Sequence, residues 1–118
     1  MKRDMNLIRL QLLRVEGEQL IPELEQFTEE QRIYHMALCI EAGLVHGEIR
    51  TDPKGFPNGT VAIRLTWAGH EFLDAARNET VWNKAKEKIK KSGVEVTISI
   101  LQELLKKLIK DSIGLSEP

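Results

Sequence analysis

The feature that most constrains the fold is the stretch "TEEQRIYHMALCIEAGL", which carries a complete set of helix signals. Thr28 and Gln31 stand at the T-x-x-Q spacing of a capping box, with two glutamates in the first turn, where the helix dipole favours negative charge. Gly43 comes where such a helix would end. The pattern predicts an amphipathic helix over residues 28–43. Its expected core-facing stripe consists of Ile33, Met36, Ala37, Ile40 and Leu44.

Two strand-like segments follow this helix, "LVHGEIR" and "TVAIRLT", with "TDPKGFPNG" between them. In the second segment Val61, Ile63 and Leu65 alternate with a small and a charged residue, the period-two pattern of a half-buried strand. The intervening segment holds two prolines, two glycines and an Asn-Gly pair, which is turn chemistry. We therefore expect an antiparallel hairpin with a long loop over residues 50–60.

Helices are expected on both sides of the hairpin. Asp4 can cap a first helix that ends at Gly17, whereas Pro22 limits residues 18–27 to a short extended piece or a single helical turn. After the hairpin, Thr66 can cap a helix that begins at Trp67. A break or a new cap is expected at residue 78, and helical spacing then continues to about residue 91. The glycine at position 93 separates it from a last amphipathic helix, "TISILQELLKKLIKDSIG".

The order of these elements predicts the fold class. Two helices with a short piece between them, then a hairpin, outline a mostly helical α+β protein with a winged-helix fold and added C-terminal helices. We expect a winged-helix domain over residues 1–92. Residues 93–118 then form a C-terminal amphipathic helix and tail.

Composition excludes several classes of protein. The 118 residues carry 17 Lys and Arg against 18 Asp and Glu, so the net charge of −1 lacks the positive balance of a strongly basic nucleic-acid-binding domain. Cys39 is the single cysteine, which rules out an intrachain disulfide and fits a reducing cytoplasm. No apolar run approaches the roughly 18 residues of a membrane span, and no signal peptide is recognisable. The sequence predicts a cytoplasmic protein without a membrane segment or a cofactor.

Three segments resemble known families. "MKRDMNLIR", "YHMALCIEAGLV" and "LTWAGHEFLDAARNETVWNKAKEKI" are together similar to a family of small uncharacterised bacterial and phage proteins, classified as a domain of unknown function. More distantly, the strand-to-helix turn "LTWAG" resembles the "LT-x-x-G" turn of YjcQ-type winged-helix proteins. The resemblance covers residues 1–91 and implies a winged helix and frequent residence in prophages. It implies no activity, so no catalytic residue is carried over.

The fold outline favours double-stranded DNA as the partner, as for a small transcriptional regulator of a phage or mobile element. In a winged helix the helix before the hairpin usually meets DNA, and polar side chains opposite its apolar stripe could read base edges. Cations on the hairpin could contact phosphates. The predicted DNA-binding residues are Gln31, Arg32, His35, Arg50, Lys54 and Arg64.

The near-neutral charge favours an alternative, a winged helix that binds an unknown protein partner and no DNA. Glu29, Glu30 and Glu41 belong to the same helix and would repel a duplex. Phe56 lies in the middle of the hairpin loop, where an exposed aromatic ring can dock on a protein. The sequence leaves these two functions open.

The last helix has two readings. Its apolar stripe suits packing against a second copy of the chain, which would give a homodimer matched to paired DNA half-sites. It equally suits packing within the chain against the helix before it. The residues of the expected oligomerisation stripe are Ile98, Leu101, Leu104, Leu105 and Leu108.

Other candidate sites are weaker. A lysine run, "NKAKEKIKK", spreads around its helix and is typical of a solvated helix end. His35 and Cys39 stand at i, i+4, but two ligands do not make a zinc site, and His46 belongs to no metal motif. His70, Glu71 and Asp74 share one helical turn without a nucleophile beside them, so we expect no enzyme. Two tryptophans, at positions 67 and 82, are both expected to pack on the core.

Overall fold

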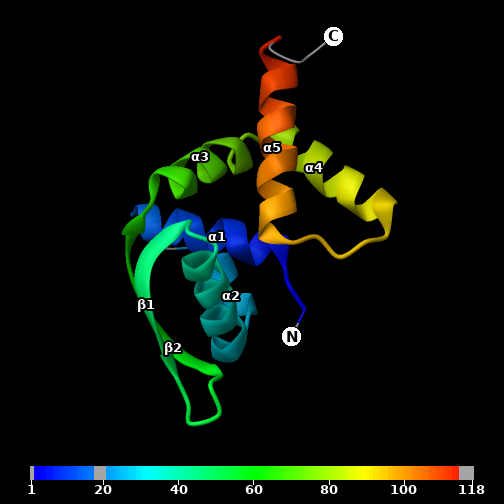
Figure 1. Cartoon of the computed structure of the whole chain (residues 1–118). Coiled ribbons are helices and arrows are strands. Elements are labelled where there is room, and N and C mark those ends of the chain that lie inside the picture. The colour runs from blue at the N-terminus through cyan, green and yellow to red at the C-terminus, as the bar shows by residue number, and fades with distance from the viewer. Residues whose placement is uncertain (1, 18–20, 115–118) are drawn as a thin grey trace. The chain divides into compact units, whose positions relative to one another are not determined.

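The computed structural model describes residues 2–17 and 21–114, which form five α-helices, one 3₁₀ helix and two strands (Figure 1). The chain divides into two compact units, Met1–His70 and Glu71–Pro118. This division differs from the predicted boundary after residue 92, because the two helices after residue 78 group with each other. Residues 115–118, which were assigned to the C-terminal tail, and residues 18–20 lie outside the described part.

The first two helical elements begin and end where the sequence predicts. Helix α1 spans Met5–Glu16, and the Asp4 side chain accepts hydrogen bonds from the backbone N–H groups of two residues in its first turn. Gly17 ends the helix with a φ of 115°, in the left-handed region that glycine reaches without strain. The 3₁₀ helix η1 then spans Pro22–Gln26, so of the two predicted alternatives the helical turn is present and the extended piece is not.

Helix α2 spans Glu29–Glu41, and its predicted capping box is present in full. The Gln31 N–H donates to Thr28 Oγ1 at 3.0 Å, and the Thr28 N–H donates to Gln31 Oε1 at 2.9 Å. The predicted buried face is wrong in part, since His35 and Cys39 are buried together with Met36. The buried stripe is therefore shifted around the helix, and two of the predicted core residues, Ile33 and Ile40, are only half-buried.

The hairpin consists of β1, Val45–Thr51, and β2, Pro57–Leu65, paired antiparallel. Its loop is shorter than predicted, because Asn58-Gly59 lies within β2 rather than in the turn. Asp52 organises the turn instead: its Oδ1 accepts from the N–H groups of Lys54 and Phe56, both at 2.9 Å. The tip of the hairpin projects beyond α2 in Figure 1.

The register of the hairpin separates an inner from an outer face. Gly47 pairs with Ala62 and Ile49 pairs with Thr60, and these residues face the helices, because β2 packs on both α1 and α2. The register shifts between His46 and Gly47, so Ile63 is an extra residue on β2 with no partner, a β-bulge.

The second unit is helical. Helix α3, Trp67–Ala76, crosses the division between the units, and α4, Glu79–Ser92, and α5, Ile98–Ser112, follow it. Asn78 caps α4 through a hydrogen bond from the Val81 N–H, and α4 packs against α5. The caps confirm the predicted break at position 78 and the predicted end of α4 at the following glycine.

The architecture is α+β and mostly helical, as predicted, with the helix–helix–hairpin arrangement of a winged helix in the first unit. Its core is made by buried side chains of α1, α2 and the strand ends nearest to them, among them Leu7, Leu12, Leu44 and Leu65. Within the described residues, no helix is both long enough and apolar enough to cross a bilayer.

Candidate interaction surface

The α2 residues expected to read DNA are used to hold the first unit together. His35 is 1% exposed, and its Nε2 accepts a hydrogen bond of 2.8 Å from the Asp4 N–H. Its Nδ1 lies 2.8 Å from the Gln31 carbonyl oxygen, to which it donates as Nδ1–H. Burial lowers the pKa of His35, partly offset by that backbone hydrogen bond and by the Asp4 carboxylate. The prediction that His35 reads bases is therefore wrong: the neutral imidazole joins the start of α1 to α2.

Gln31 and Arg32, the other two α2 residues predicted to read DNA, also form side-chain hydrogen bonds within the chain. Gln31 uses its side-chain oxygen to close the capping box. Arg32 is half-buried, and its Nη1 donates to the Leu24 carbonyl oxygen of η1 at 3.2 Å. Gln31 would have to give up its bond before its amide oxygen could contact a base edge, and Arg32 would have to do so before its Nη1 could.

The side chains that α2 does expose are acidic. All three of its exposed residues are glutamates, at positions 29, 30 and 41. The described residues of α2 thus present carboxylates to solvent and no exposed cation. Carboxylates facing the phosphates of a duplex would weaken binding.

The outer face of the hairpin has a different character, and we call its six exposed side chains the hairpin surface. Because successive residues of a strand point to opposite faces, the residues adjacent to the inner ones along each strand face outward. Val61 and Ile63 supply an apolar centre, and Ile63 is 66% exposed. The hairpin surface consists of His46, Glu48 and Arg50 from β1 and Val61, Ile63 and Arg64 from β2.

The exposure of Val61 and Ile63 overturns part of the strand prediction. Their alternation with Leu65 predicted a buried face, but only Leu65 is buried. The bulge at Ile63 breaks the alternation, and the inner face instead carries the small residues Thr60 and Ala62 close to the helices. A single sequence shows the alternation but does not show which face meets the helices.

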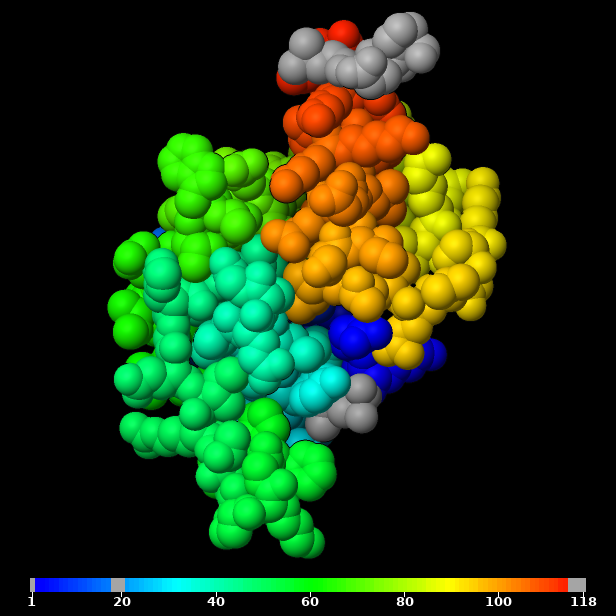
Figure 2. Space-filling view, in the orientation of Figure 1, coloured from blue at the N-terminus to red at the C-terminus, as the bar shows by residue number. Residues whose placement is uncertain are grey.

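The predicted hairpin cations are placed as expected. Arg50, Lys54 and Arg64 are all exposed, and no ion pair joins any of them to another described residue. Lys54 lies in the turn beside Phe56, which is 65% exposed. Figure 2 shows this end of the hairpin as a protrusion from the first unit. The three cations are free to meet an anionic partner.

Trp67 adds a large apolar side chain directly after the hairpin. It was expected to pack beneath the hairpin, but this prediction is wrong, since the ring is 81% exposed. The preceding turn explains why, because Thr66 Oγ1 donates to the Gly43 carbonyl oxygen and accepts from the Gly69 N–H at 2.9 Å. These bonds hold the first turn of α3 against the end of α2, and Trp67 is left in solvent.

Sequence reasoning missed Ile63 and Trp67 as surface residues. The available signal was Gly69, two residues after Trp67 in the "LTWAG" turn. A Cβ at this position would lie 2.0 Å from the Leu44 carbonyl oxygen, so the backbone of α3 approaches the chain there. The turn buries Leu65 and Gly69, and Trp67, between them, points elsewhere.

The remaining candidates have ordinary surroundings. Burial raises the pKa of the Cys39 thiol to about 12, so the thiol stays protonated at neutral pH. Among the described residues, no three His, Cys, Asp or Glu side chains gather as metal ligands would. His70, Glu71 and Asp74 are exposed on α3. The lysines of α4 lie at its surface, and Lys91 pairs with Glu87 at 3.0 Å.

The stripe assigned to oligomerisation lies mostly inside the chain. Ile98, Leu101, Leu105 and Leu108 are buried, and Leu104 is half-buried. Side chains already buried in one copy have little surface left for a second. The structure therefore favours the alternative reading of α5, packing against α4 within the chain.

These observations define a small α+β protein whose first unit is a winged-helix-like module with an acidic helix surface and an apolar, cation-bordered hairpin surface. The chain belongs to the family described as "Hypothetical protein (DUF2513)", whose model matches residues 2–95. It is also similar to an uncharacterized protein of Haemophilus influenzae, at 32% identity over 121 residues, which is 97% of this chain and 100% of the relative. No solved structure matches the chain. The similarity to a small family is thereby confirmed, whereas the distant likeness to YjcQ-type proteins stays a prediction.

Proposed function

We propose that this protein is an interaction module that binds another protein through the hairpin surface and Trp67. The observation that carries the proposal is the exposure of Ile63 and Trp67, four residues apart, at 66% and 81%. Large apolar side chains left in solvent close together on a small domain mark interaction sites, since burying them on binding is favourable. Tryptophan in particular is enriched among the residues that dominate binding energy.

The chemistry of the partner follows from the rim of this surface. Arg50 and Arg64 border the apolar centre, and His46 lies opposite Arg64 across the strands. The single carboxylate among the six side chains is Glu48. A complementary partner has an apolar patch flanked by carboxylates, because unlike charges across an interface favour encounter and fix orientation.

The acidic surface of α2 argues against sequence-specific DNA reading. In a winged helix that reads DNA, the helix before the hairpin enters the major groove. Here that helix exposes Glu29, Glu30 and Glu41, and its Arg32 is bonded to η1. Base readout by this helix would place carboxylates against the duplex and break a bond within the chain.

Duplex contact through the hairpin alone is the second candidate, and the free cations Arg50, Lys54 and Arg64 favour it. Each phosphate that a cation neutralises contributes about −0.9 to the slope of log K against log salt. Three cations would give a slope of about −2.7. Such binding would be weak and independent of sequence. We also infer a cytoplasmic location from the single unpaired thiol.

Site-specific photo-cross-linking in the native host tests the protein-binding proposal. A photoactivatable amino acid replaces Ile63 in one strain and Val94 in the other, because the two side chains are equally exposed, at 66%. We expect one defined protein adduct from position 63 that is absent from position 94. Adding Trp67→Ser or Arg50→Glu to the position-63 strain should reduce that adduct several-fold.

Two results would overturn the proposal. One is the same set of adducts from both positions, which would mean random encounters. The other is an adduct from position 63 that survives Trp67→Ser and Arg50→Glu. An adduct with twice the mass of the chain would assign the surface to self-association.

A further inference from the structure

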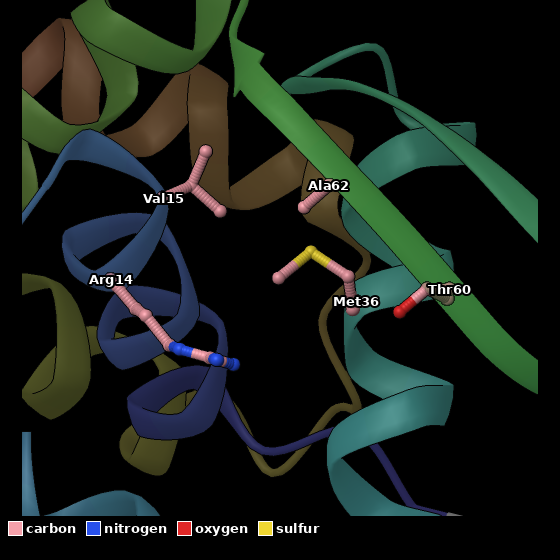
Figure 3. Close-up of a pocket in the computed structure, with 5 residues that line it drawn as sticks. All are labelled: Arg14, Val15, Met36, Thr60 and Ala62. Atoms are coloured by element: carbon pink, nitrogen blue, oxygen red, sulfur yellow. The ribbon is translucent and has the colours of Figure 1, made fainter.

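We propose that a groove between α1, α2 and β2 binds a small zwitterion, an α-amino acid with an apolar side chain. This site lies on the inner side of the hairpin and is independent of the function proposed for its outer side. The groove has a volume of about 310 Å³, at the lower end of the range for sites of drug-sized molecules. Figure 3 shows its lining residues, Arg14, Val15, Met36, Thr60 and Ala62.

A second hollow of about 180 Å³ shares three lining residues with the groove. Arg14, Met36 and Thr60 line both spaces, and all lining residues belong to the first compact unit. In Figure 3 the Met36 side chain extends from α2 into the space, and the Thr60 hydroxyl points in from β2. The residues that line the second hollow are Gln11, Arg14, Glu29, Arg32, Ile33, Met36 and Thr60.

An unsatisfied buried acceptor lines the second hollow. Gln11 is 2% exposed, and its Nε2 donates to the Arg32 carbonyl oxygen at 2.9 Å, which fixes the orientation of the amide. Its Oε1 is buried and has no hydrogen-bond partner among the described residues. A buried acceptor left without a donor is unfavourable, so the site calls for an N–H or O–H group.

The other polar groups define the charges of the ligand. Arg14 is exposed at the groove, and no described residue forms an ion pair with its guanidinium, which can bind a carboxylate with two parallel hydrogen bonds. Glu29 and Arg32 also line the second hollow. Because Arg32 Nη1 already donates to the Leu24 carbonyl oxygen, we assign the recognition of a cationic donor to Glu29 and Gln11 Oε1. A carboxylate for Arg14 and an ammonium group for Gln11 and Glu29 are the two charges of an α-amino acid.

The apolar walls define the rest of the ligand. Val15, Met36 and Ala62 surround the wider part of the groove, where a short hydrocarbon chain would be buried. A plain hydrocarbon would leave both Arg14 and Gln11 without partners. The combination selects an amino acid of the size of leucine or methionine.

Binding is measured on the intact chain by following ¹⁵N–¹H chemical shifts during titration with L-leucine and L-methionine. We expect saturable shifts confined to residues 11–15, 29–36 and 60–62. Isocaproate, which lacks the ammonium group, and isoamylamine, which lacks the carboxylate, should each bind at least about tenfold more weakly, since each loses one charged contact.

Two substitutions separate recognition from folding. Arg14→Gln changes an exposed side chain and should weaken L-leucine binding about tenfold or more, whereas Gln11→Met removes the acceptor and should weaken it to a similar degree. Lys88→Gln is the control: Lys88 is an exposed residue of α4 in the other unit, and its replacement removes one positive charge, as Arg14→Gln does. This variant should leave binding unchanged. The proposal is overturned by the absence of saturable shifts up to about 10 mM amino acid, a concentration well above weak specific binding. Binding of either isocaproate or isoamylamine as tight as that of L-leucine would overturn it as well.

Discussion

At the scale of single residues, polar side chains that look like surface readers in the sequence are structural in this protein. His35, which was predicted to read bases, accepts from the Asp4 N–H and donates to the Gln31 carbonyl oxygen. A second buried polar side chain, Gln11, which the sequence did not single out, donates to the Arg32 carbonyl oxygen. All of these bonds cross or border the contact between α1 and α2. Helical periodicity gives the angular position of a histidine on its helix, but it does not show whether a hydrogen-bond partner from another element lies there. For this reason the sequence analysis predicted that His35 is exposed.

The buried imidazole makes stability depend on pH. Burial lowers the pKa of His35 in the folded chain below its ordinary value near 6.5, so the unfolded chain takes up this proton first on acidification. The stabilisation from neutral His35 is therefore present above pH 6.5 and is lost as the pH falls from there towards the lowered pKa. Protonation of Nε2 would also place a donor against the Asp4 N–H.

Urea unfolding at about pH 7.5 and about pH 5.5 measures this effect. The free energy of unfolding should fall more in the wild-type chain than in His35→Gln, which has no proton to gain. His46→Gln, which removes an exposed imidazole from the hairpin surface, should retain the wild-type pH dependence. An identical pH dependence in wild type and His35→Gln would contradict the role assigned to the buried ring.

Gly69 gives a second prediction at this scale. A Cβ added there would lie 2.0 Å from the backbone oxygen of Leu44, and backbone cannot move aside as a flexible side chain can. Gly69→Ala should lower the free energy of unfolding by roughly 3 kcal/mol. Gly59→Ala is the matched control, because its nearest atoms are 3.9 Å away on the Arg50 side chain, and it should change stability by under about 1 kcal/mol. Equal effects of the two would refute the close approach.

At the scale of elements, the sequence predicted the helices well because their ends are local chemistry. The capping box at Thr28, the left-handed Gly17 and the cap at Asn78 each act within one turn of their own helix. The hairpin was predicted less well, since Asn-Gly is a common turn signal and yet lies within β2. Which face of a strand or helix is buried depends on packing against elements that are distant in the sequence. For this reason Ile63 is exposed and His35 is buried, both contrary to the prediction.

The turn of the hairpin can be tested through Asp52. Its carboxylate accepts two backbone hydrogen bonds of 2.9 Å, from Lys54 and Phe56. Asp52→Ala should lower stability by about 1 kcal/mol and speed hydrogen exchange at those two amides. Asn58→Ala should leave both amides unchanged if the turn lies where the structure places it. Faster exchange in Asn58→Ala alone would restore the Asn-Gly turn predicted from the sequence.

At the scale of the whole molecule, the chain consists of two compact units with α3 shared between them in sequence. The apolar stripe of α5 belongs to the second unit, where α4 and α5 pack together. Its periodicity could be recognised in the sequence, but periodicity alone does not distinguish packing within a chain from packing between chains. The burial of Leu101 and Leu105 in one copy makes that distinction.

The packing of α5 within the chain predicts how stability responds when its apolar side chains are shortened to alanine. Leu105→Ala should lower the free energy of unfolding by roughly 2–5 kcal/mol, and the exposed neighbour Ile100→Ala should have little effect. The midpoint of thermal unfolding should not change with protein concentration, because no second copy contributes. A midpoint that rises with concentration, and that Leu105→Ala makes insensitive to concentration, would support dimerisation through α5 instead.

Titration of a labelled duplex shows whether α2 reads DNA or whether, as we propose, the hairpin faces a protein instead. Fluorescence anisotropy is followed at about 50 mM and about 200 mM salt, where phosphate contacts show their salt dependence. We expect no binding that saturates at micromolar protein at the lower salt, and a gain of binding in the double variant Glu30→Lys, Glu41→Lys. Micromolar binding by the wild-type chain, with a slope steeper than about −2.7 and further weakened by Arg32→Ala, would contradict the account and assign the winged helix to DNA.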